Sequence, residues 1–426
     1  MIIPSIDLMN GQAVQLRQGA VKVLDAGDPR PLATKFGVVG EIAVVDLDAA
    51  LGKGSNEPVI RDLIKLAPCR VGGGIRDAAT AVKWLDAGAA KVVLGTRAVP
   101  EVLEKLPRDR VIAALDAKHG EVVIEGWLQG TGRRVIDRMQ ELRPYVGGFL
   151  VTFVEIEGTM TGLDPARAGP LLDCAGDCKL TLAGGVKSAA EIAELDKLGV
   201  DAQVGMGLYT GAFDLAGSVA ACLATDRPDA LWPTVVVDEA GVALGLAYSN
   251  AESLKAAIDQ RRGVYYSRSR KALWTKGDTS GATQDLIRVD ADCDRDTLRF
   301  TVRQHGPGFC HKNTRTCWGP EAAGELHALA RRLAAPAADR DPASYTTRLL
   351  NDPALLGAKL REEAAELVGA LTGPEITHEA ADVLYFTLVR LAAAGIDLGD
   401  VERELTRRSL KVSRRPGGPK PPVEPR

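Results

Sequence analysis

The chain has 426 residues, of which 46% are hydrophobic, and its formal net charge is −3. This length exceeds one ordinary domain, so two or three domains are expected, each with enough apolar material for a core. The slightly acidic balance, without an extended basic stripe, argues against nucleic-acid binding. No apolar run reaches the length of a membrane span, and no targeting segment is recognisable. Seven cysteines, an odd and modest number, fit a reduced, cytoplasmic protein rather than a secreted one.

Residues 1–226 contain an internal repeat. Three short pieces recur about 110 residues further along the chain: IPSIDL at 3–8 with IAALDA at 112–117, VGGGIRD at 71–77 with LAGGVKS at 182–188, and VVLGTRAV at 92–99 with AQVGMGLY at 202–209. One nearly constant spacing indicates a duplicated half. Short apolar strands alternate with helical stretches in each half, which is typical of a parallel sheet. The pattern therefore predicts a TIM (β/α)8 barrel built from two half-barrel repeats.

Asp7 and Asp116 occupy equivalent places in the two halves, at predicted strand ends. Barrel chemistry lies at the carboxyl ends of the strands, so the two acids are expected to face each other and to share general acid and base work. Glycine-rich turns in both halves offer backbone N–H groups to phosphate. The predicted phosphate contacts are Gly73, Gly74, Gly95, Thr96, Gly184, Gly185 and Gly205. Each glycine alone is better explained as a turn, but two equivalent sets favour a substrate with a phosphate at each end.

These residues carry a resemblance to a known family. The pieces IIPSIDLMNGQAVQLRQG, VVDLDAALG, VGGGIRD, LGTRAV, ALDAKHGEVVIEGW and EGTMTGLD resemble the phosphoribosylformimino aminoimidazole carboxamide ribotide isomerase of histidine biosynthesis. The resemblance implies that Asp7 and Asp116 are the acid–base pair and that Thr152 is catalytic. Glu157 stands where the family has Asp, and Ala183 replaces a Ser, so a barrel with a lost or changed reaction is the alternative. The sister cyclase barrel is disfavoured by the sequence of the first strand.

A linker at 225–233, TDRPDALWP, separates the barrel from the next region. That region contains two donor-rich segments, YSRSR and WTKGDTSG. Arginine forks and hydroxyl groups suit phosphate. The predicted substrate contacts there are Ser267, Arg268, Ser269, Arg270 and Lys276.

Three cysteines, Cys293, Cys310 and Cys317, lie close together in the sequence. Three thiolates make a tetrahedral zinc site with one open position, which is the catalytic arrangement. Two alternatives stay open on spacing alone. One is a closed site with His305 or His311 as the fourth ligand, and the other is three small buried thiols without metal.

Three acids, Asp292, Asp294 and Asp296, alternate with Cys293 and Arg295. Alternate residues of an extended segment share one face, so the three carboxylates are expected to converge and Cys293 to point away. Converging carboxylates repel one another unless a hard cation such as Mg2+ lies among them. A solvated acidic turn is the alternative.

The order of these pieces resembles phosphoribosyl-AMP cyclohydrolase over about residues 233–320, through SRSR, LW-K-GDTSG-Q, DCD-D and CH-x5-CW. The resemblance implies zinc on the three cysteines and magnesium on the three aspartates. A zinc-activated water would then open the adenine ring of phosphoribosyl-AMP. His311 is the predicted catalytic proton carrier, with His305 as the alternative. Asp278 stands where the family usually has Glu, and Ala282 where it usually has Asn.

The last region, 321–412, is predicted to be helical. LLGAKLREEAAELVGAL and ITHEAADVLYFTLVRLAAAG show apolar residues at helical spacing. Carboxylates on the two helices are predicted to hold Mg2+ between them. They are Glu362, Glu363 and Glu366 on the first helix and Glu379 and Asp382 on the second. A solvated helix face is the alternative. The EExxE and ExxD pattern resembles the all-α pyrophosphohydrolases, and SYTTRLL with AKLREEAAE narrows this to phosphoribosyl-ATP pyrophosphohydrolase.

The predicted domains are an isomerase-like barrel at 1–226, a small α+β zinc-binding cyclohydrolase domain at 233–320 and an all-α pyrophosphohydrolase domain at 321–412, followed by a disordered tail at 413–426. The resemblances imply three consecutive steps of histidine biosynthesis: removal of pyrophosphate from phosphoribosyl-ATP, ring opening of phosphoribosyl-AMP, and an aldose–ketose type isomerisation. A bifunctional hydrolase with a non-catalytic or repurposed barrel is one alternative, and a nucleotide-binding scaffold is another. The expected partners are phosphoribosyl nucleotides and a second copy of the chain, in a homodimer through the cyclohydrolase and helical domains.

Overall fold

A computed structural model describes residues 1–426 except 20, 125–126, 128, 320–325, 336–340 and 414–426. The predicted disordered tail therefore lies outside the described residues from position 414 onward. The chain divides into two compact units. The first comprises Met1–Val237, Leu246–Gly306 and Leu410–Arg426, and the second comprises Asp238–Gly245 and Pro307–Ser409.

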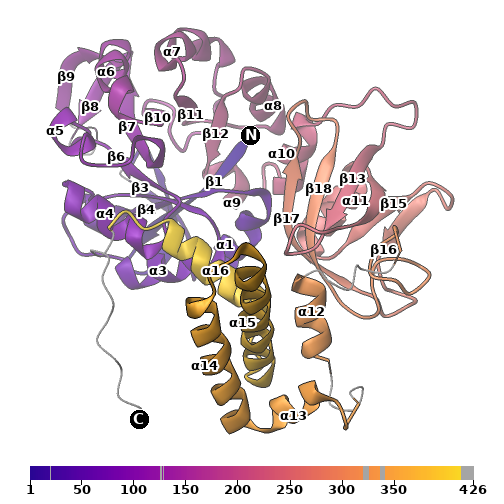
Figure 1. The fold of residues 1–426 in the computed structure, drawn as a ribbon. Helices are drawn as coiled ribbons and strands as arrows, with labels where there is room; N and C mark the ends of the chain where they lie inside the picture. Colours follow the sequence, from indigo (N-terminus) through magenta and orange to yellow (C-terminus); the bar gives the residue numbers. More distant parts are fainter. Residues whose placement is uncertain (20, 125–126, 128, 320–325, 336–340, 414–426) are drawn as a thin grey trace. The chain divides into compact units, whose positions relative to one another are not determined.

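Parallel strands of the first unit form a closed barrel (Figure 1). They are β1 (Ile2–Met9), β4 (Ile42–Asp46), β5 (Cys69–Gly72), β6 (Lys91–Leu94), β7 (Val111–Lys118), β10 (Gly148–Phe153), β11 (Lys179–Ala183) and β12 (Asp201–Val204). They pair in the order β1-β4-β5-β6-β7-β10-β11-β12, and β12 pairs with β1 to close the ring. Four strands come from each predicted half, so the predicted TIM barrel is confirmed.

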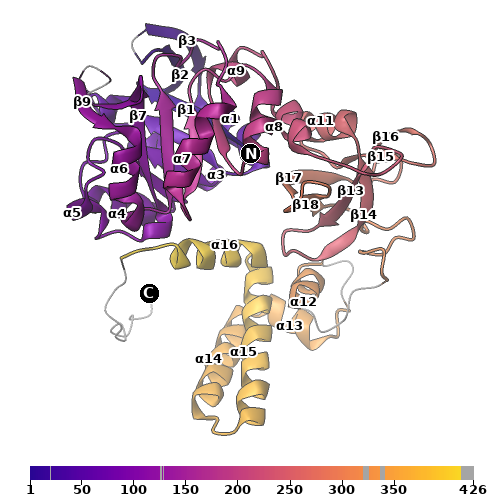
Figure 2. The same cartoon turned by 90° about the horizontal axis from the view of Figure 1, so that it is seen from above.

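Helices lie outside the barrel strands (Figures 1 and 2). The longer ones are α1 (Pro29–Phe36), α3 (Glu57–Leu66), α4 (Ala78–Ala87), α6 (Val135–Leu142), α7 (Ala168–Ala175), α8 (Ala189–Lys197) and α10 (Leu215–Cys222). Single turns occur at α2 (Leu47–Ala50), α5 (Pro100–Leu103), α9 (Met206–Tyr209), η1 (Gly37–Val39), η2 (Arg108–Arg110), η3 (Arg143–Tyr145) and η4 (Pro165–Arg167). Local signals set the ends of α4: the Asp77 side chain caps Thr80 N at 2.7 Å, and Gly88 ends it at φ 108°.

Each half also carries a β-hairpin after its first strand. Strands β2 (Gln12–Arg17) and β3 (Val21–Gly27) extend β1 in antiparallel fashion, and β8 (Glu121–Ile124) and β9 (Gln129–Arg134) extend β7. The duplication therefore includes the hairpins as well as the barrel strands.

Alternate residues of the barrel strands fill the interior. Ile112, Leu150 and Ala183, from three adjacent strands, form a buried cluster there. Side chains alternate along a strand. Asp116 on β7 and Thr152 on β10 therefore face the same interior as Ile112 and Leu150, nearer the carboxyl ends of their strands.

A mixed sheet with the strand order β14-β13-β18-β17 belongs to the first unit, apart from residues 243–245 at the start of β14. Its parts are β13 (Trp232–Val237), β14 (Ala243–Ser249), β17 (Gln284–Ala291) and β18 (Leu298–Gln304), with helix α11 (Ala251–Gln260) and the hairpin of β15 (Val264–Ser267) and β16 (Ala272–Thr275). Tyr265 is fully buried, and its hydroxyl donates to Gln284 Oε1 at 2.7 Å. The bond satisfies the one polar atom of this large core side chain.

The second unit is mainly helical, as predicted for the last region. It contains α12 (Leu326–Leu333), α13 (Tyr345–Asn351), α14 (Pro353–Gly369), α15 (Gly373–Ala393) and α16 (Leu398–Ser409). Its core consists of Leu333, Leu349, Leu356, Phe386, Leu388 and Val389. The Thr372 side chain and Glu375 form a capping box at the start of α15. None of the helices in the part of the chain that the structure describes is long and apolar enough to cross a membrane.

Candidate functional site

Three carboxyl groups meet at the carboxyl ends of the barrel strands. Asp7 lies near the end of β1, Asp116 near the end of β7, and Glu157 follows β10. The charges of Asp7 and Asp116 both raise the pKa of Glu157, which makes the three groups electrostatic neighbours. The structure thus brings the predicted pair together and adds Glu157, which the sequence showed only as a departure from a family pattern.

The surroundings of this carboxyl group trio (Asp7, Asp116 and Glu157) favour bound protons. Each side chain keeps some exposure through the mouth, yet desolvation inside the barrel raises its pKa. The pKa of Asp7 rises to about 6, although a hydrogen bond from Ser5 Oγ at 3.0 Å opposes the shift. The pKa of Glu157 rises to about 7 through desolvation and the two neighbouring charges. The pKa values of Asp7 and Glu157 near neutrality, and the raised pKa of Asp116, suit general acid–base chemistry.

Thr152, the predicted catalytic threonine, lies beside Asp116. The two residues are register partners on neighbouring parallel strands. The side chains of Thr152 and Trp127 hydrogen-bond to Asp116, and these bonds oppose the rise in its pKa caused by desolvation. The contact gives Thr152 a physical role in holding Asp116 and in tuning its protonation.

The tip of the β2–β3 hairpin lies against the segment that carries Glu157. Gln18 N donates to Glu157 O at 3.1 Å, and Gln18 Nε2 donates to Glu155 O at 3.2 Å. Gly158, at φ 68°, permits this approach, because a Cβ there would lie 2.6 Å from Leu16 O. The hairpin therefore helps to fix the backbone of the segment that carries Glu157.

The predicted glycine turns follow β5 and β11 in equivalent positions. A Cβ on Gly73 would collide with the backbone of Asp46, and one on Gly184 would lie 2.7 Å from Phe153 O. Gly74 and Gly185 both have positive φ, at 71° and 73°. Close packing therefore already explains these glycines, while their backbone N–H groups stay near the barrel mouth.

The second predicted glycine set differs between the halves. Gly95 and Thr96 follow β6 and are exposed, with open space around the Cα of Gly95. Gly205 precedes the single turn α9, and the side chain amide of Gln15 occupies the place that a Cβ would take. The two ends of the barrel mouth are therefore unequal.

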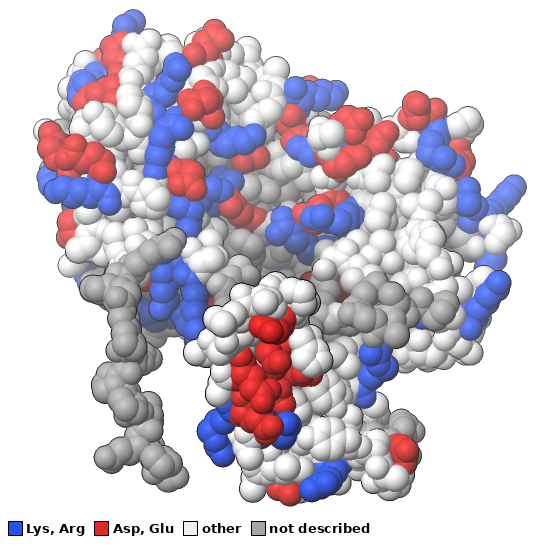
Figure 3. Space-filling model, in the orientation of Figure 1, with Lys and Arg blue, Asp and Glu red and all other residues white. Residues whose placement is uncertain are grey.

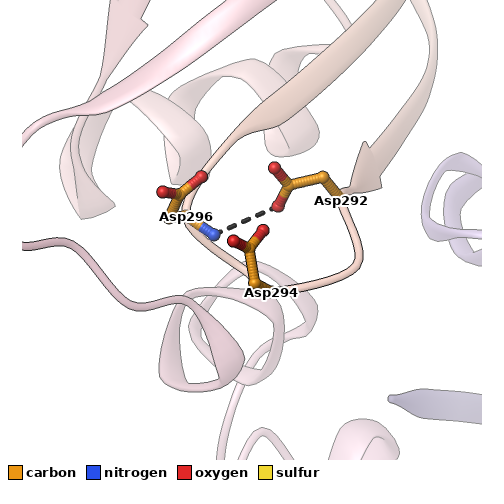
Figure 4. A group of neighbouring side chains, drawn as sticks. All are labelled: Asp292, Asp294 and Asp296. Atoms are coloured by element: carbon orange, nitrogen blue, oxygen red, sulfur yellow. Dashed lines mark hydrogen bonds between the residues drawn. The ribbon is translucent and has the colours of Figure 1, made fainter.

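The three predicted magnesium ligands of the small sheet converge, but not in a strand. Asp292, Asp294 and Asp296 lie in the bent loop between β17 and β18, and their nearest ligand oxygens lie within 4.8 Å of one another (Figure 4). Asp292 Oδ1 accepts from Asp296 N and Thr297 N at 3.1 Å each. The expected extended segment is wrong, because Arg295 adopts a left-handed φ of 67° and reverses the chain. The oxygen-rich cluster has the chemistry that Mg2+ prefers.

The predicted zinc ligands belong to different units. Cys310 and Cys317 lie in the second unit, where hydrogen bonds from Lys312 N, the Thr314 side chain and Cys317 lower the pKa of Cys310. A thiolate is the form that binds zinc, so this pair fits the predicted group. Cys293 lies in the first unit, in the same loop as the aspartates.

The two candidate histidines are also divided between the units. His311 is exposed and follows Cys310 in the second unit. His305 lies in the first unit, with its Nε2 2.8 Å from Asp285 Oδ2. His311 therefore stays the predicted proton carrier, with His305 as the alternative.

The predicted substrate donors of the small sheet lie at opposite ends of one hairpin. Strands β15 and β16 are antiparallel, with Val264 opposite Thr275 and Ser267 opposite Ala272. The segment Ser267–Arg270 therefore forms the hairpin turn, while Lys276 is buried at the other end. Within the turn, Arg270 N donates to Ser267 Oγ at 3.3 Å, and the Arg268 guanidinium lies 3.9 Å from the ring centroid of Tyr248.

The helical unit has its own acidic group, over α14 and α15 (Figure 3). Ligand oxygens of Glu363, Glu366 and Glu379 lie within 4.8 Å of one another. Partial desolvation and the charge of Glu379 raise the pKa of Glu366. Glu379 Oε2 is buried without a hydrogen-bond partner among the described residues, so this group fits a divalent cation.

Two predicted ligands lie outside that group. Glu362 and Glu363 both form ion pairs with Lys359, at 2.9 and 2.8 Å, but only Glu363 also reaches the other helix. Asp382 pairs with His378 at 3.5 Å. Helical geometry explains the first result, because neighbouring residues point about 100° apart and Glu362 and Glu363 cannot both face the partner helix. Asp382 shares a helix face with Glu379, so helical spacing alone does not explain why it pairs with His378 instead.

Three family models match the chain, one in each predicted region. Histidine biosynthesis protein matches residues 1–214, phosphoribosyl-AMP cyclohydrolase matches 245–319, and phosphoribosyl-ATP pyrophosphohydrolase matches 326–409. The first match alone covers half of the chain. The chain belongs to the histidine biosynthesis protein family. The resemblances drawn from its sequence motifs are thereby confirmed.

Relatives of this histidine biosynthesis protein include fused and single-domain proteins. A histidine biosynthesis trifunctional protein of Saccharomyces bayanus is 49% identical over 207 residues, which are 49% of this chain and 26% of that protein. A phosphoribosyl imidazole-4-carboxamide isomerase of Methanocaldococcus jannaschii is 33% identical over 228 residues, 50% of this chain and 96% of the isomerase. A bifunctional protein of Schizosaccharomyces pombe is 47% identical over 46% of each chain. The chain thus spans about a quarter of the trifunctional relatives and nearly all of the isomerase.

Proposed function

We propose that the chain catalyses three consecutive steps of histidine biosynthesis. It removes pyrophosphate from phosphoribosyl-ATP, opens the ring of phosphoribosyl-AMP, and isomerises the opened product. One observation carries this proposal: each region matched by a family model contains its own converging acidic group, at Asp7, at Asp292 and at Glu363. A scaffold that only binds nucleotides gives no reason for three such groups.

The barrel residues support the isomerisation by moving protons. An aldose–ketose isomerisation takes a proton from carbon and delivers one to oxygen, so it needs a base and an acid in one site. Asp7, with a pKa of about 6, is largely ionised at neutral pH and can accept the proton. Asp116 is its partner, held by Thr152. Glu157, with a pKa of about 7, retains part of its proton and so limits repulsion within the trio.

In the cyclohydrolase region, Cys293, Cys310 and Cys317 would hold zinc. The chemistry that zinc supplies is the activation of a water as nucleophile at the adenine ring. Asp292, Asp294 and Asp296 would hold magnesium. His311 would carry a proton at this site, and Ser267–Arg270 would bind phosphate oxygens.

In the helical unit, Glu363, Glu366 and Glu379 would hold Mg2+. The cation supplies charge neutralisation for the triphosphate. The three glutamates would fix the position of the cation. The buried Glu379 Oε2 would serve as a ligand, because it has no competing hydrogen bond among the described residues. Lys359, which bridges Glu362 and Glu363, fixes the Glu363 side chain beside the others.

Product analysis by mass spectrometry tests the proposal in the full-length chain. Phosphoribosyl-ATP is supplied with Zn2+ and Mg2+, and the last compound that accumulates is identified. We expect Glu366→Gln to leave phosphoribosyl-ATP, Asp294→Asn to accumulate phosphoribosyl-AMP, and Asp7→Asn to accumulate the ring-opened product. If Asp7→Asn and the wild type both stop at the ring-opened product, the barrel is not an isomerase and the chain is a bifunctional hydrolase. Elemental analysis without stoichiometric zinc would favour the scaffold.

The proposal includes a homodimer, formed through the cyclohydrolase and helical regions, in the cytoplasm. Two apolar side chains near the α14–α15 turn support a covered surface there: Val368 is 87% exposed and Leu371 is 89% exposed. Large apolar groups at such exposure favour association. Sedimentation analysis of the wild type and of Val368→Glu/Leu371→Glu measures this, and a monomeric wild type contradicts the proposal.

A further inference from the structure

Arg295 is the single basic residue of the loop 292–297. Its side chain extends toward the barrel and pairs with an acid there. Its Nε and Nη2 donate to the two carboxylate oxygens of Asp196 on α8, at 2.8 and 2.9 Å. This bidentate arrangement is the strongest geometry for an arginine–carboxylate pair. The Asp196 side chain is only 6% exposed, so the pair is well shielded from solvent.

The same contact fixes the backbone of the loop. Arg295 O accepts from Ala224 N, just after α10 of the barrel, at 2.8 Å, and Arg295 Nη1 donates to Asp292 O at 2.9 Å. Arg295 has a φ of 67°, a left-handed conformation that residues with a Cβ adopt only where surrounding contacts hold them. That conformation turns the chain between Asp294 and Asp296 and so sets the spacing of the three carboxylates.

Asp196 also keeps a competing charge away from these carboxylates. A guanidinium placed between Asp294 and Asp296 in the sequence would neutralise them if it turned inward, because opposite charges in contact attract strongly. In the structure both of its terminal nitrogens are occupied elsewhere, by Asp196 and by Asp292 O. The carboxylate oxygens of Asp292 and Asp296 accept hydrogen bonds from Asp296 N, Thr297 N and the Thr297 hydroxyl instead. Asp294 and Asp296 remain exposed.

We propose that Asp196 of the barrel is a positioning residue for the divalent-cation site of the loop 292–297, acting through Arg295. This inference rests on the proposed magnesium site, but it does not require the barrel to catalyse isomerisation. It gives the barrel a second use: the cation affinity of the neighbouring cyclohydrolase sheet depends on a barrel helix.

The experiment measures Mn2+ binding to the zinc-loaded full-length chain by electron paramagnetic resonance. All proteins carry Glu366→Gln and Glu379→Gln, so that the helical acidic group does not contribute. We expect Asp196→Asn to weaken Mn2+ binding about tenfold, which is the usual cost of removing a group that orients metal ligands. Arg295→Lys keeps the charge and cannot bind both oxygens, so it should weaken binding in the same direction. It also leaves intact the bond from the Met1 amino group to Asp196.

A matched control separates positioning from general contact with the barrel. Lys255 on α11 pairs with Asp214 of the barrel at 2.6 Å but does not touch the loop. We expect Lys255→Gln to bind Mn2+ like the parent. Equal weakening by Lys255→Gln, or unchanged binding in both Asp196→Asn and Arg295→Lys, would overturn the inference. Parent binding that is unaffected by Asp294→Asn would remove the proposed cation site itself, and the inference with it.

Discussion

The barrel mouth and the loop 292–297 each gather three carboxyl groups, in opposite surroundings. Asp7 and Glu157 lie inside the barrel, where desolvation raises their pKa values to about 6 and about 7. Asp294 and Asp296 lie in a bent loop and are exposed. The comparison teaches that the environment, rather than residue type, decides what an acidic trio does: a desolvated trio retains protons to exchange, and a hydrated trio is available to a cation.

The largest expected effect comes from removing one carboxyl group of the barrel trio. Asp7→Asn removes the group that accepts the proton, and general base catalysis contributes about 10²–10⁴-fold. We expect the isomerisation rate to fall about 10³-fold, while both hydrolytic steps keep their rates. Separate assays of the three steps on one preparation measure this. Equal loss in all three steps would mean that the substitution damages the fold.

The loop trio should respond to cation concentration instead. Asp294→Asn removes a predicted ligand, so ring opening should need about a hundredfold more Mg2+ for half-maximal rate, at the upper end of the ten- to hundredfold that is typical even of groups that only orient ligands. The control is Asp290→Asn, an acid of β17 that pairs with Arg299 at 2.9 Å and lies outside the trio. The same Mg2+ titration for both variants would contradict the distinction between the two trios.

Desolvation of the barrel trio should lower the free energy of unfolding when these groups are ionised. Glu157 has a folded pKa of about 7 against an ordinary value of 4.5, so its ionisation destabilises the folded barrel as pH rises through this range. Below pH 4.5 the group is protonated in both states and contributes nothing. The free energy of unfolding of Glu157→Gln should therefore exceed that of the wild type at pH 8 by on the order of 2 kcal/mol. This gain should disappear toward pH 4.5.

Urea unfolding of the barrel at several pH values measures this gain. Glu157→Asp is the matched control, because it retains a titrating group in the same place. A gain that is independent of pH would show that packing, not ionisation, is responsible.

The smallest effect concerns the partner of Asp116. Thr152→Val removes a hydrogen bond that lowers the pKa of Asp116 against desolvation. We expect isomerisation to slow about tenfold, at the low end of what acid–base groups contribute, and its pH profile to move upward. Thr152→Ser retains the hydroxyl and should restore the profile. A slower rate with an unmoved profile would leave Thr152 a packing role only.

The barrel and its acid pair could be predicted from the sequence because both depend on regular features. The repeat places Asp7 and Asp116 at equivalent strand ends, and the two-residue period of a strand sends both inward. Glu157 could not be placed in the same way, because it follows β10 in a turn whose path depends on contacts with the β2–β3 hairpin. Its sequence signal was present, in an acid at a position where the family has one.

The loop 292–297 shows where local patterning fails. Alternation predicted a strand, but aspartate is depleted in strands and its side chain caps turns, as Asp292 does for Asp296. The pairing of Arg295 with Asp196, 99 residues away, lies beyond any local signal. On the helices, Glu363, Glu366 and Glu379 lie together, but the pattern alone did not show that Asp382 lies outside this group and pairs with His378.

The Gln15 side chain, which occupies the space beside Gly205, has a consequence for how a substrate would be oriented in the barrel. The two halves of the barrel would offer nearly the same cradle to either phosphate of a long, two-ended molecule, and such a molecule could then lie in either sense. Gln15 narrows one end, whereas the corresponding space at Gly95 is open. Under the proposed function, this difference between the two halves would give a two-ended substrate one orientation in an otherwise duplicated barrel.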